Sequence, residues 1–237
     1  MRAKGASFTY LPAQATHHLH HHSSHPTPLP IHPPPTQAVR ASDFALGEFR
    51  FLVRLLAVHG RYSFIRLAGL IQFSFYKNLV LALPQFYFSF LSGWSGQTVY
   101  EEVLLSSFNI IWTAAPPLVM GMLEKDVREH VCLEYPTLYN TLKGRDIFTR
   151  KSFFGWLGLA LFHSLVIFWG VTYGVIRYGQ IYADGSTVGL WTMGAMLSLC
   201  TTTVVLFKAA TYHRMWTWIT HFIIWGSLLG FLLFACM

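Results

Sequence analysis

The sequence predicts an all-α protein: a polytopic membrane bundle of about five transmembrane helices that follows a disordered N-terminal tail. Composition is the first reason, because 53% of the 237 residues are hydrophobic and only 11% are charged, whereas a soluble domain carries about 25% charged residues. Periodic apolar stretches are the second, since each approaches the roughly 20 residues that a helix needs to cross a bilayer. The expected spans are 70–92, 103–123, 152–176, 188–208 and 216–237.

Two segments precede the transmembrane domain expected over 70–237. Residues 1–36 are low-complexity, with seven His and six Pro between His17 and Pro35. Such a tract can hold a metal ion, but nothing in it fixes a coordination geometry, so we expect a disordered tail and no metal site. It is also open whether these residues are native to the protein. Residues 37–69 indicate a cytoplasmic helical approach to the first span.

The distribution of basic residues predicts the orientation of the spans. Segments 40–66, 124–151 and 208–214 together hold thirteen Lys and Arg residues, whereas the opposite side holds Arg177 alone. By the positive-inside rule the thirteen face the cytoplasm. Because the net charge of +7 is spread over loops and forms no patch, it does not indicate a nucleic-acid partner.

The first span carries a polar face. Lys77 and Asn78 are adjacent, and Ser74 lies one turn earlier on the helix. An isolated charge near the bilayer centre costs about 2.5–3.5 kcal/mol on insertion scales, so it usually faces a partner or a wet cavity. No Asp or Glu lies in any expected span. Lys77 therefore fits a cavity that receives an anionic or zwitterionic group. Two alternatives are open: it snorkels to the interface, or it only pairs with a backbone carbonyl or with a residue of a span that is missing here.

The second span contains a proline pair. Pro116 and Pro117 remove two adjacent backbone donors at membrane depth, so the helix should kink or unwind there. Unwound backbone within a membrane is tolerated only where it is buried or lines a cavity. Asn109 lies on the same helical face as Pro116. The pattern favours a polar pathway with a gating kink at the prolines, and a kink that serves packing alone is the alternative.

Four stretches of the chain now carry a resemblance to the C-terminal part of the lipid-flipping (type IV) P-type ATPases. They are QAVRASDFALGEFRFL at 37–52, VHGRYSFIRLAGLIQFSFYKN at 58–78, SGWSGQTVYEEVLLSSFNIIWTAAPPLVMGMLEKDV at 92–127 and LEYPTLYNTLKGRDIFTRKSFFGW at 133–156. The resemblance covers about 200 of 237 residues. It implies a phospholipid-translocating ATPase, or flippase, in the plasma membrane or the endomembrane system.

The resemblance also implies a site, cofactors and partners. In the family, the lysine and asparagine at the positions of Lys77 and Asn78 lie near the route of the lipid headgroup, and Asn109 falls at a polar position of the next span. We add Ser74 as a further residue of this route. The family uses ATP and Mg²⁺, acts on phospholipid, and has a small two-span accessory subunit. We expect none of these cofactors to be bound by the residues of this chain.

The chain departs from the family where the catalytic machinery is concerned. Neither the DKTGT motif, which holds the phosphorylated aspartate, nor the Mg²⁺-binding DGxGxND motif occurs in it. We therefore expect a membrane-domain fragment that moves lipid only within an intact enzyme, has no catalytic residue of its own and is inactive alone. The alternative is a non-catalytic truncated membrane protein that binds lipid or a partner subunit.

Overall fold

The computed structural model describes residues 8–10, 43–140, 147–177 and 189–236. The chain divides into two units, Met1–Gly60 and Arg61–Met237. The tail expected over 1–36 lies outside the described residues except for residues 8–10.

The described part of the first unit is small. Its strands β1 (Phe8–Tyr10) and β2 (Phe44–Leu46) pair in parallel. The short helix α2 (Phe51–Arg54) and the π-helical turn η1 (Leu55–Gly60) follow. These strands of three residues each are the only ones among the described residues, so the all-α class predicted from the sequence is confirmed.

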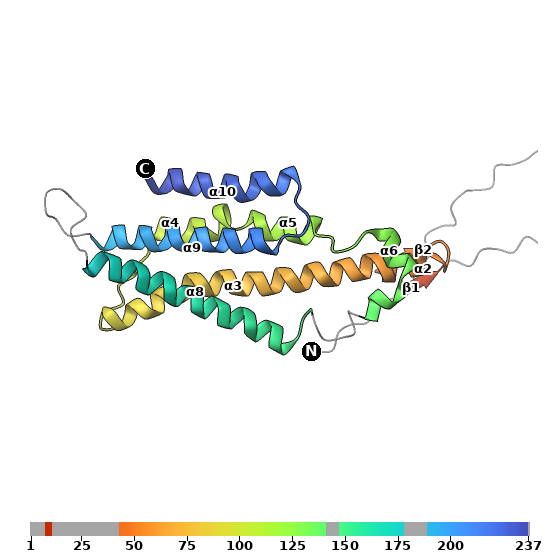
Figure 1. The fold of residues 1–237 in the computed structure, drawn as a ribbon, viewed down its shortest axis with the longest axis horizontal. Helices are drawn as coiled ribbons and strands as arrows, with labels where there is room; N and C mark the ends of the chain where they lie inside the picture. The colour runs from red at the N-terminus through yellow and green to blue at the C-terminus, as the bar shows by residue number, and fades with distance from the viewer. Residues whose placement is uncertain (1–7, 11–42, 141–146, 178–188, 237) are drawn as a thin grey trace, which may run out of the picture. The chain divides into compact units, whose positions relative to one another are not determined.

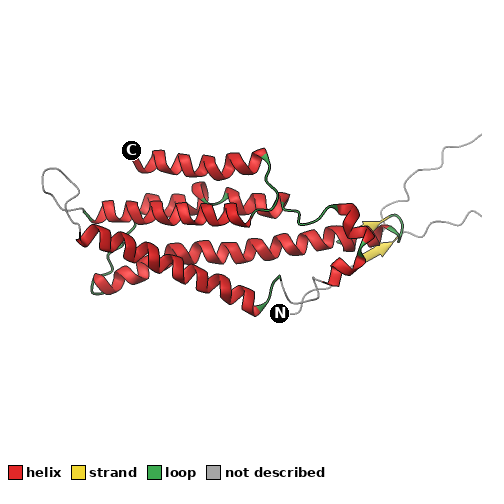
Figure 2. Cartoon of the chain, viewed as in Figure 1, coloured by secondary structure: helices red, strands yellow, loops and turns green. Residues whose placement is uncertain are grey.

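Helices form nearly all of the second unit (Figures 1 and 2). In chain order they are α3 (Arg61–Leu91), α4 (Glu102–Ser107), the π-helical η2 (Phe108–Trp112), α5 (Ala115–Leu123), α6 (Glu129–Glu134), the 3₁₀ turn η3 (Pro136–Tyr139), α8 (Arg150–Arg177), α9 (Leu190–Tyr212) and α10 (Trp218–Cys236).

Five helical segments among the described residues are long and apolar enough to cross a membrane. They are Phe51–Leu91, Glu102–Leu123, Arg150–Gly174, Leu190–Tyr212 and Trp218–Ala235. The number of spans agrees with the sequence prediction, and the boundaries differ where polar residues continue a helix. Helix α3 begins at Arg61 rather than at 70, and α9 ends at Tyr212 rather than at 208. Hydropathy marks only the apolar part of a helix, whereas its backbone hydrogen bonds continue past that part.

Helix α3 lies at the centre of the bundle. It packs against α8, α5 and α9, while α10 packs against α9 and returns to α5 and η2 (Figure 1). The buried aromatic residues Phe73, Phe108 and Phe168 belong to one core cluster, which joins α3, η2 and α8. Tyr76 and His163 connect α3 to α8 through a 2.6 Å hydrogen bond between the hydroxyl group and Nδ1. The position of every other span is thereby defined by its contact with α3 or with a neighbour of α3.

The outer face of the bundle is apolar. On α10, for example, Trp218 is 91% exposed and Phe222 is 80% exposed. Contiguous exposed apolar surface is costly in water and is favourable in hydrocarbon. The outward orientation of these large side chains fits a bundle that is surrounded by lipid.

Candidate functional site

The second span is interrupted near its middle. Helix α4 passes into the wider π-helical turn η2, and a regular helix resumes only at α5. Pro116 and Pro117 fall in the first turn of α5. Backbone N–H groups in a first helical turn have no partner within the helix, so proline is tolerated there. The proline pair thus determines where the new helix can begin.

The prolines also deprive a carbonyl of its usual donor. In a continuous helix the carbonyl of Thr113 would accept a hydrogen bond from the N–H of residue 117, and Pro117 has no N–H. Thr113 itself is non-helical, with φ −123° and ψ 9°. Its N–H donates to the carbonyl of Phe108 at 3.0 Å, and its hydroxyl donates to the same oxygen at 2.7 Å. The Thr113 carbonyl is left facing the neighbouring helix.

Lys77, on α3, supplies a hydrogen-bond donor to this carbonyl. Its Nζ donates to the carbonyl oxygen of Thr113 at 3.2 Å and approaches Thr113 Oγ1 at 3.3 Å. Lys77 is only 7% exposed. A buried backbone carbonyl requires a donor, and a buried ammonium group requires acceptors, so the two groups satisfy each other. In the structure Lys77 therefore lies inside the bundle and pairs with a backbone carbonyl.

The other residues predicted for the lipid route lie elsewhere around this break. Asn78 and Asn109 are exposed on the surface of the bundle, and Ser74 is half-buried. Successive helical residues are separated by about 100°, so Asn78 points away from the direction taken by Lys77. The structure therefore brings Lys77 together with Pro117 through Thr113, and it does not bring Lys77 together with the two asparagines.

Sequence reasoning did not name Thr113 as a site residue. A signal was present, because Thr113 precedes Pro117 by the four residues of a helical hydrogen bond. That spacing identifies a carbonyl without its helical donor. It does not say which helix supplies the replacement, since nothing in the sequence specifies that α3 packs against the break.

The described residues offer no site for a magnesium ion. No group of three or more His, Cys, Asp or Glu side chains gathers among them in a way that could hold a metal. The two buried carboxylates at the end of α5 are engaged instead with Arg61 and His213. The Mg²⁺ ion that the resemblance implies thus finds no such group of ligands among the residues described here.

The five apolar helical segments found in the described part of the chain, one of them broken beside a buried lysine, define a multi-pass integral membrane protein. Comparison with known families gives a match of residues 39–237 to the family described as "Phospholipid-translocating P-type ATPase C-terminal". The chain belongs to this family, and the resemblance noted from the sequence is confirmed.

Individual relatives agree with the family assignment. The chain is 38% identical over 201 residues to probable phospholipid-transporting ATPase 4 of Arabidopsis thaliana. It is 37% identical over 201 residues to phospholipid-transporting ATPase IH of Homo sapiens and to phospholipid-transporting ATPase 6 of Arabidopsis thaliana. These alignments cover 85% of the chain and 16–18% of the relatives. The chain thus spans about one sixth of the length of the curated relatives it matches.

Proposed function

We propose that this chain forms the C-terminal membrane part of an ATP-driven phospholipid translocase, and that Lys77 receives the lipid headgroup at the break in the second span. The family supplies the class of activity. The observation that supports the role of Lys77 is its buried ammonium group, which is held by the carbonyl of Thr113 and, among the described residues, by no carboxylate.

The contacts of Lys77 suit an exchangeable site. Both hydrogen bonds to Thr113, at 3.2 and 3.3 Å, are longer than the usual 2.9–3.0 Å. An ammonium group has three donors and binds a phosphate or carboxylate oxygen more strongly than a neutral carbonyl. A headgroup that leaves water needs such donors, because an unpaired polar group in hydrocarbon costs several kcal/mol. In the proposal, Lys77 exchanges the Thr113 carbonyl for an oxygen of the headgroup.

The remaining predicted residues complete the route in this proposal. Asn78 and Asn109 are exposed amides within membrane-spanning segments, where each offers both a donor and an acceptor. Ser74 adds a hydroxyl on α3. The break before Pro116 and Pro117 gives α5 freedom to tilt against η2 as the headgroup passes.

The intact enzyme includes further components in this proposal. ATP and Mg²⁺ act in parts of the enzyme other than the residues described here, and a small two-span accessory subunit accompanies them. The resemblance to the family supports these components.

The test uses a chimera in which residues 39–237 replace the matching segment of human phospholipid-transporting ATPase IH. Lys77→Ala should raise the lipid concentration for half-maximal ATPase stimulation by about 10- to 100-fold, the equivalent of about 1.5–3 kcal/mol for a hydrogen bond to a charged group. Asn78→Ala should raise it by less, because a neutral hydrogen bond contributes about 0.5–1.5 kcal/mol. Phosphorylation by ATP should remain near the parent level in both variants.

The matched control is Lys151→Ala, which removes an exposed lysine near the start of α8. It should leave the lipid dependence unchanged. If Lys77→Ala keeps the lipid dependence and turnover of the parent chimera, the headgroup role of Lys77 is wrong.

A further inference from the structure

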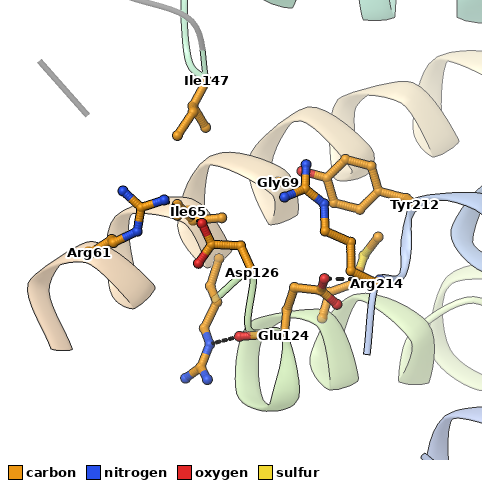
Figure 3. A pocket seen from close by; sticks show the side chains of 10 residues that line it. Arg61, Ile65, Gly69, Glu124, Asp126, Ile147, Tyr212 and Arg214 are labelled. Atoms are coloured by element: carbon orange, nitrogen blue, oxygen red, sulfur yellow. Dashed lines mark hydrogen bonds and ion pairs between the residues drawn. The ribbon is translucent and has the colours of Figure 1, made fainter. Parts of the chain in front are cut away.

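A second polar cavity lies at one end of the bundle. It occupies about 260 Å³ between the beginning of α3, the end of α5 and the connection from α9 to α10 (Figure 3). Arg66 contributes from α3, Glu124 and Asp126 from the segment after α5, and Tyr212 and Arg214 from the end of α9. By the distribution of basic residues this end is the cytoplasmic one. The cavity is distinct from the Lys77 site, because neither Lys77 nor its hydrogen-bond partner Thr113 is among its lining residues.

Glu124 links the segments that surround this cavity through hydrogen bonds. Its Oε1 accepts the backbone N–H of Arg214 at 3.0 Å, and its Oε2 lies 3.3 Å from Nδ1 of His213. Its backbone carbonyl accepts a hydrogen bond from Nε of Arg66 at 2.6 Å (Figure 3). Both carboxylate oxygens of Glu124 are therefore occupied, and they fix the connection between α9 and α10 against the end of α5.

Only one of the two carboxylate oxygens of Asp126 has a partner among the described residues. Its side chain is 8% exposed, and its Oδ2 forms an ion pair with Arg61. Its Oδ1 is buried and has no hydrogen-bond partner among the described residues. Leaving a buried acceptor unsatisfied costs about 1–3 kcal/mol, and more when the group is charged. Asp126 is one of the residues that line the cavity, so a small movement of its side chain would let a ligand there supply the missing donor.

Besides Arg61, which pairs with Asp126, two further cationic groups line the same cavity. The terminal nitrogens of Arg66 and the guanidinium group of Arg214 form no hydrogen bond or ion pair within the described part of the chain. Guanidinium groups present paired donors that match the oxygens of a phosphate group. The cavity therefore combines free donors for an anion with one buried acceptor that requires a donor in return.

We propose that this cavity binds a phosphate group that carries a hydrogen-bond donor. Arg66 and Arg214 take phosphate oxygens, and Asp126 Oδ1 accepts the donor. Two probes represent this chemistry. Inorganic phosphate has a P–OH group near neutral pH, and a phosphatidylethanolamine headgroup has an ammonium N–H beside its phosphodiester. Sulfate and phosphatidylcholine resemble them in charge and lack the donor, so they provide matched negative probes.

The experiment measures the thermal unfolding temperature of the full chain in detergent micelles, with the Lys77→Ala substitution present throughout so that the headgroup contact proposed above does not contribute. The four probes are sodium phosphate, sodium sulfate at equal ionic strength, short-chain phosphatidylethanolamine and short-chain phosphatidylcholine. A ligand that binds only the folded chain raises this temperature. We expect a rise with phosphate, with phosphatidylethanolamine or with both, and none with the two negative probes. A response to phosphate alone identifies a soluble anion, and a response to phosphatidylethanolamine alone identifies a lipid.

Amino-acid substitutions test whether the rise in unfolding temperature comes from binding in this cavity. Arg214→Gln changes an exposed side chain and should weaken binding of the active probe at least about tenfold, the loss expected for a charge-assisted hydrogen bond. Asp126→Asn keeps an acceptor for Arg61 and offers an amide donor to the cavity, so it should admit sulfate. Lys151→Gln should bind like the parent.

The proposal is wrong if sulfate acts like phosphate and phosphatidylcholine acts like phosphatidylethanolamine in the parent chain. It is equally wrong if Arg214→Gln retains the full response.

Discussion

Two buried cations on α3 are stabilised in different ways. Lys77 pairs with the backbone of Thr113, whereas Arg61 forms an ion pair with Asp126 and donates to the carbonyl of Leu138. A buried charge that loses its partner is strongly destabilising, while an exposed pair contributes little. The stability that the buried ion pair between Arg61 and Asp126 contributes can therefore be compared with that of the exposed ion pair between Lys125 and Glu129.

At the residue scale we predict that Arg61→Met destabilises the chain by about 3–5 kcal/mol, because it leaves Asp126 buried and unpaired. The control is Lys125→Met, which breaks the exposed pair between Lys125 and Glu129 at 3.6 Å and should cost about 0.3–0.5 kcal/mol. The free energy of unfolding can be measured by titrating SDS into mixed micelles. Equal losses for the two variants would contradict the importance assigned to the buried pair.

At the scale of elements, one close contact positions the connection between α3 and α4. Gln85 on α3 accepts the N–H of Val99 at 2.9 Å and donates to the carbonyl of Gln97 at 3.1 Å. The carbonyl of Val99 then lies against Gly194 of α9, where an added Cβ would come within 2.0 Å of the oxygen. Only glycine leaves room for this approach of two backbones.

We accordingly predict that Gly194→Ala destabilises the bundle by about 1–3 kcal/mol, the usual range for overpacking. Gly158→Ala on α8 is the matched control, because a Cβ there meets nothing within 4 Å. That substitution should stabilise the helix by up to about 1 kcal/mol. Thermal unfolding in detergent compares the two variants. A Gly194→Ala protein as stable as the parent would contradict the claim that the Val99 carbonyl leaves no room for a side chain at this position.

Much of this arrangement could be predicted from the sequence, and the reasons are local. Apolar length identifies the spans, and two adjacent prolines identify a break, because both features act within one helix. The partner of Lys77 and the pairing of Arg61 with Asp126 depend on which helices pack together. In the sequence, Asp126 is simply one charge in a polar loop. Hydropathy contains no information on that packing.

At the scale of the whole molecule, the second unit has two polar ends. The connection between α3 and α4 lies at one end, and the connections between α5 and α8 and between α9 and α10 lie at the other (Figure 1). The basic residues gather at the second end, which the positive-inside rule places in the cytoplasm.

This orientation predicts the accessibility of introduced cysteines. In a background without the native cysteines, Ser95→Cys should react with an impermeant maleimide from outside the cell, and Thr137→Cys should react only after the membrane is permeabilised. Both positions are exposed in the structure. Labelling of Thr137→Cys in sealed cells, with Ser95→Cys protected, would reverse the orientation.

The central claim is that Lys77 is held in the bundle by the carbonyl that Pro117 leaves without a donor. A double-mutant cycle between Lys77→Met and Pro117→Ala measures this directly as free energies of unfolding. Pro117→Ala restores an N–H for the Thr113 carbonyl, so Lys77→Met should cost at least about 1 kcal/mol less in that background, within the 0.5–3 kcal/mol typical of coupled residues. Costs that agree within about 0.3–0.5 kcal/mol in the two backgrounds, as for independent sites, would contradict the claim.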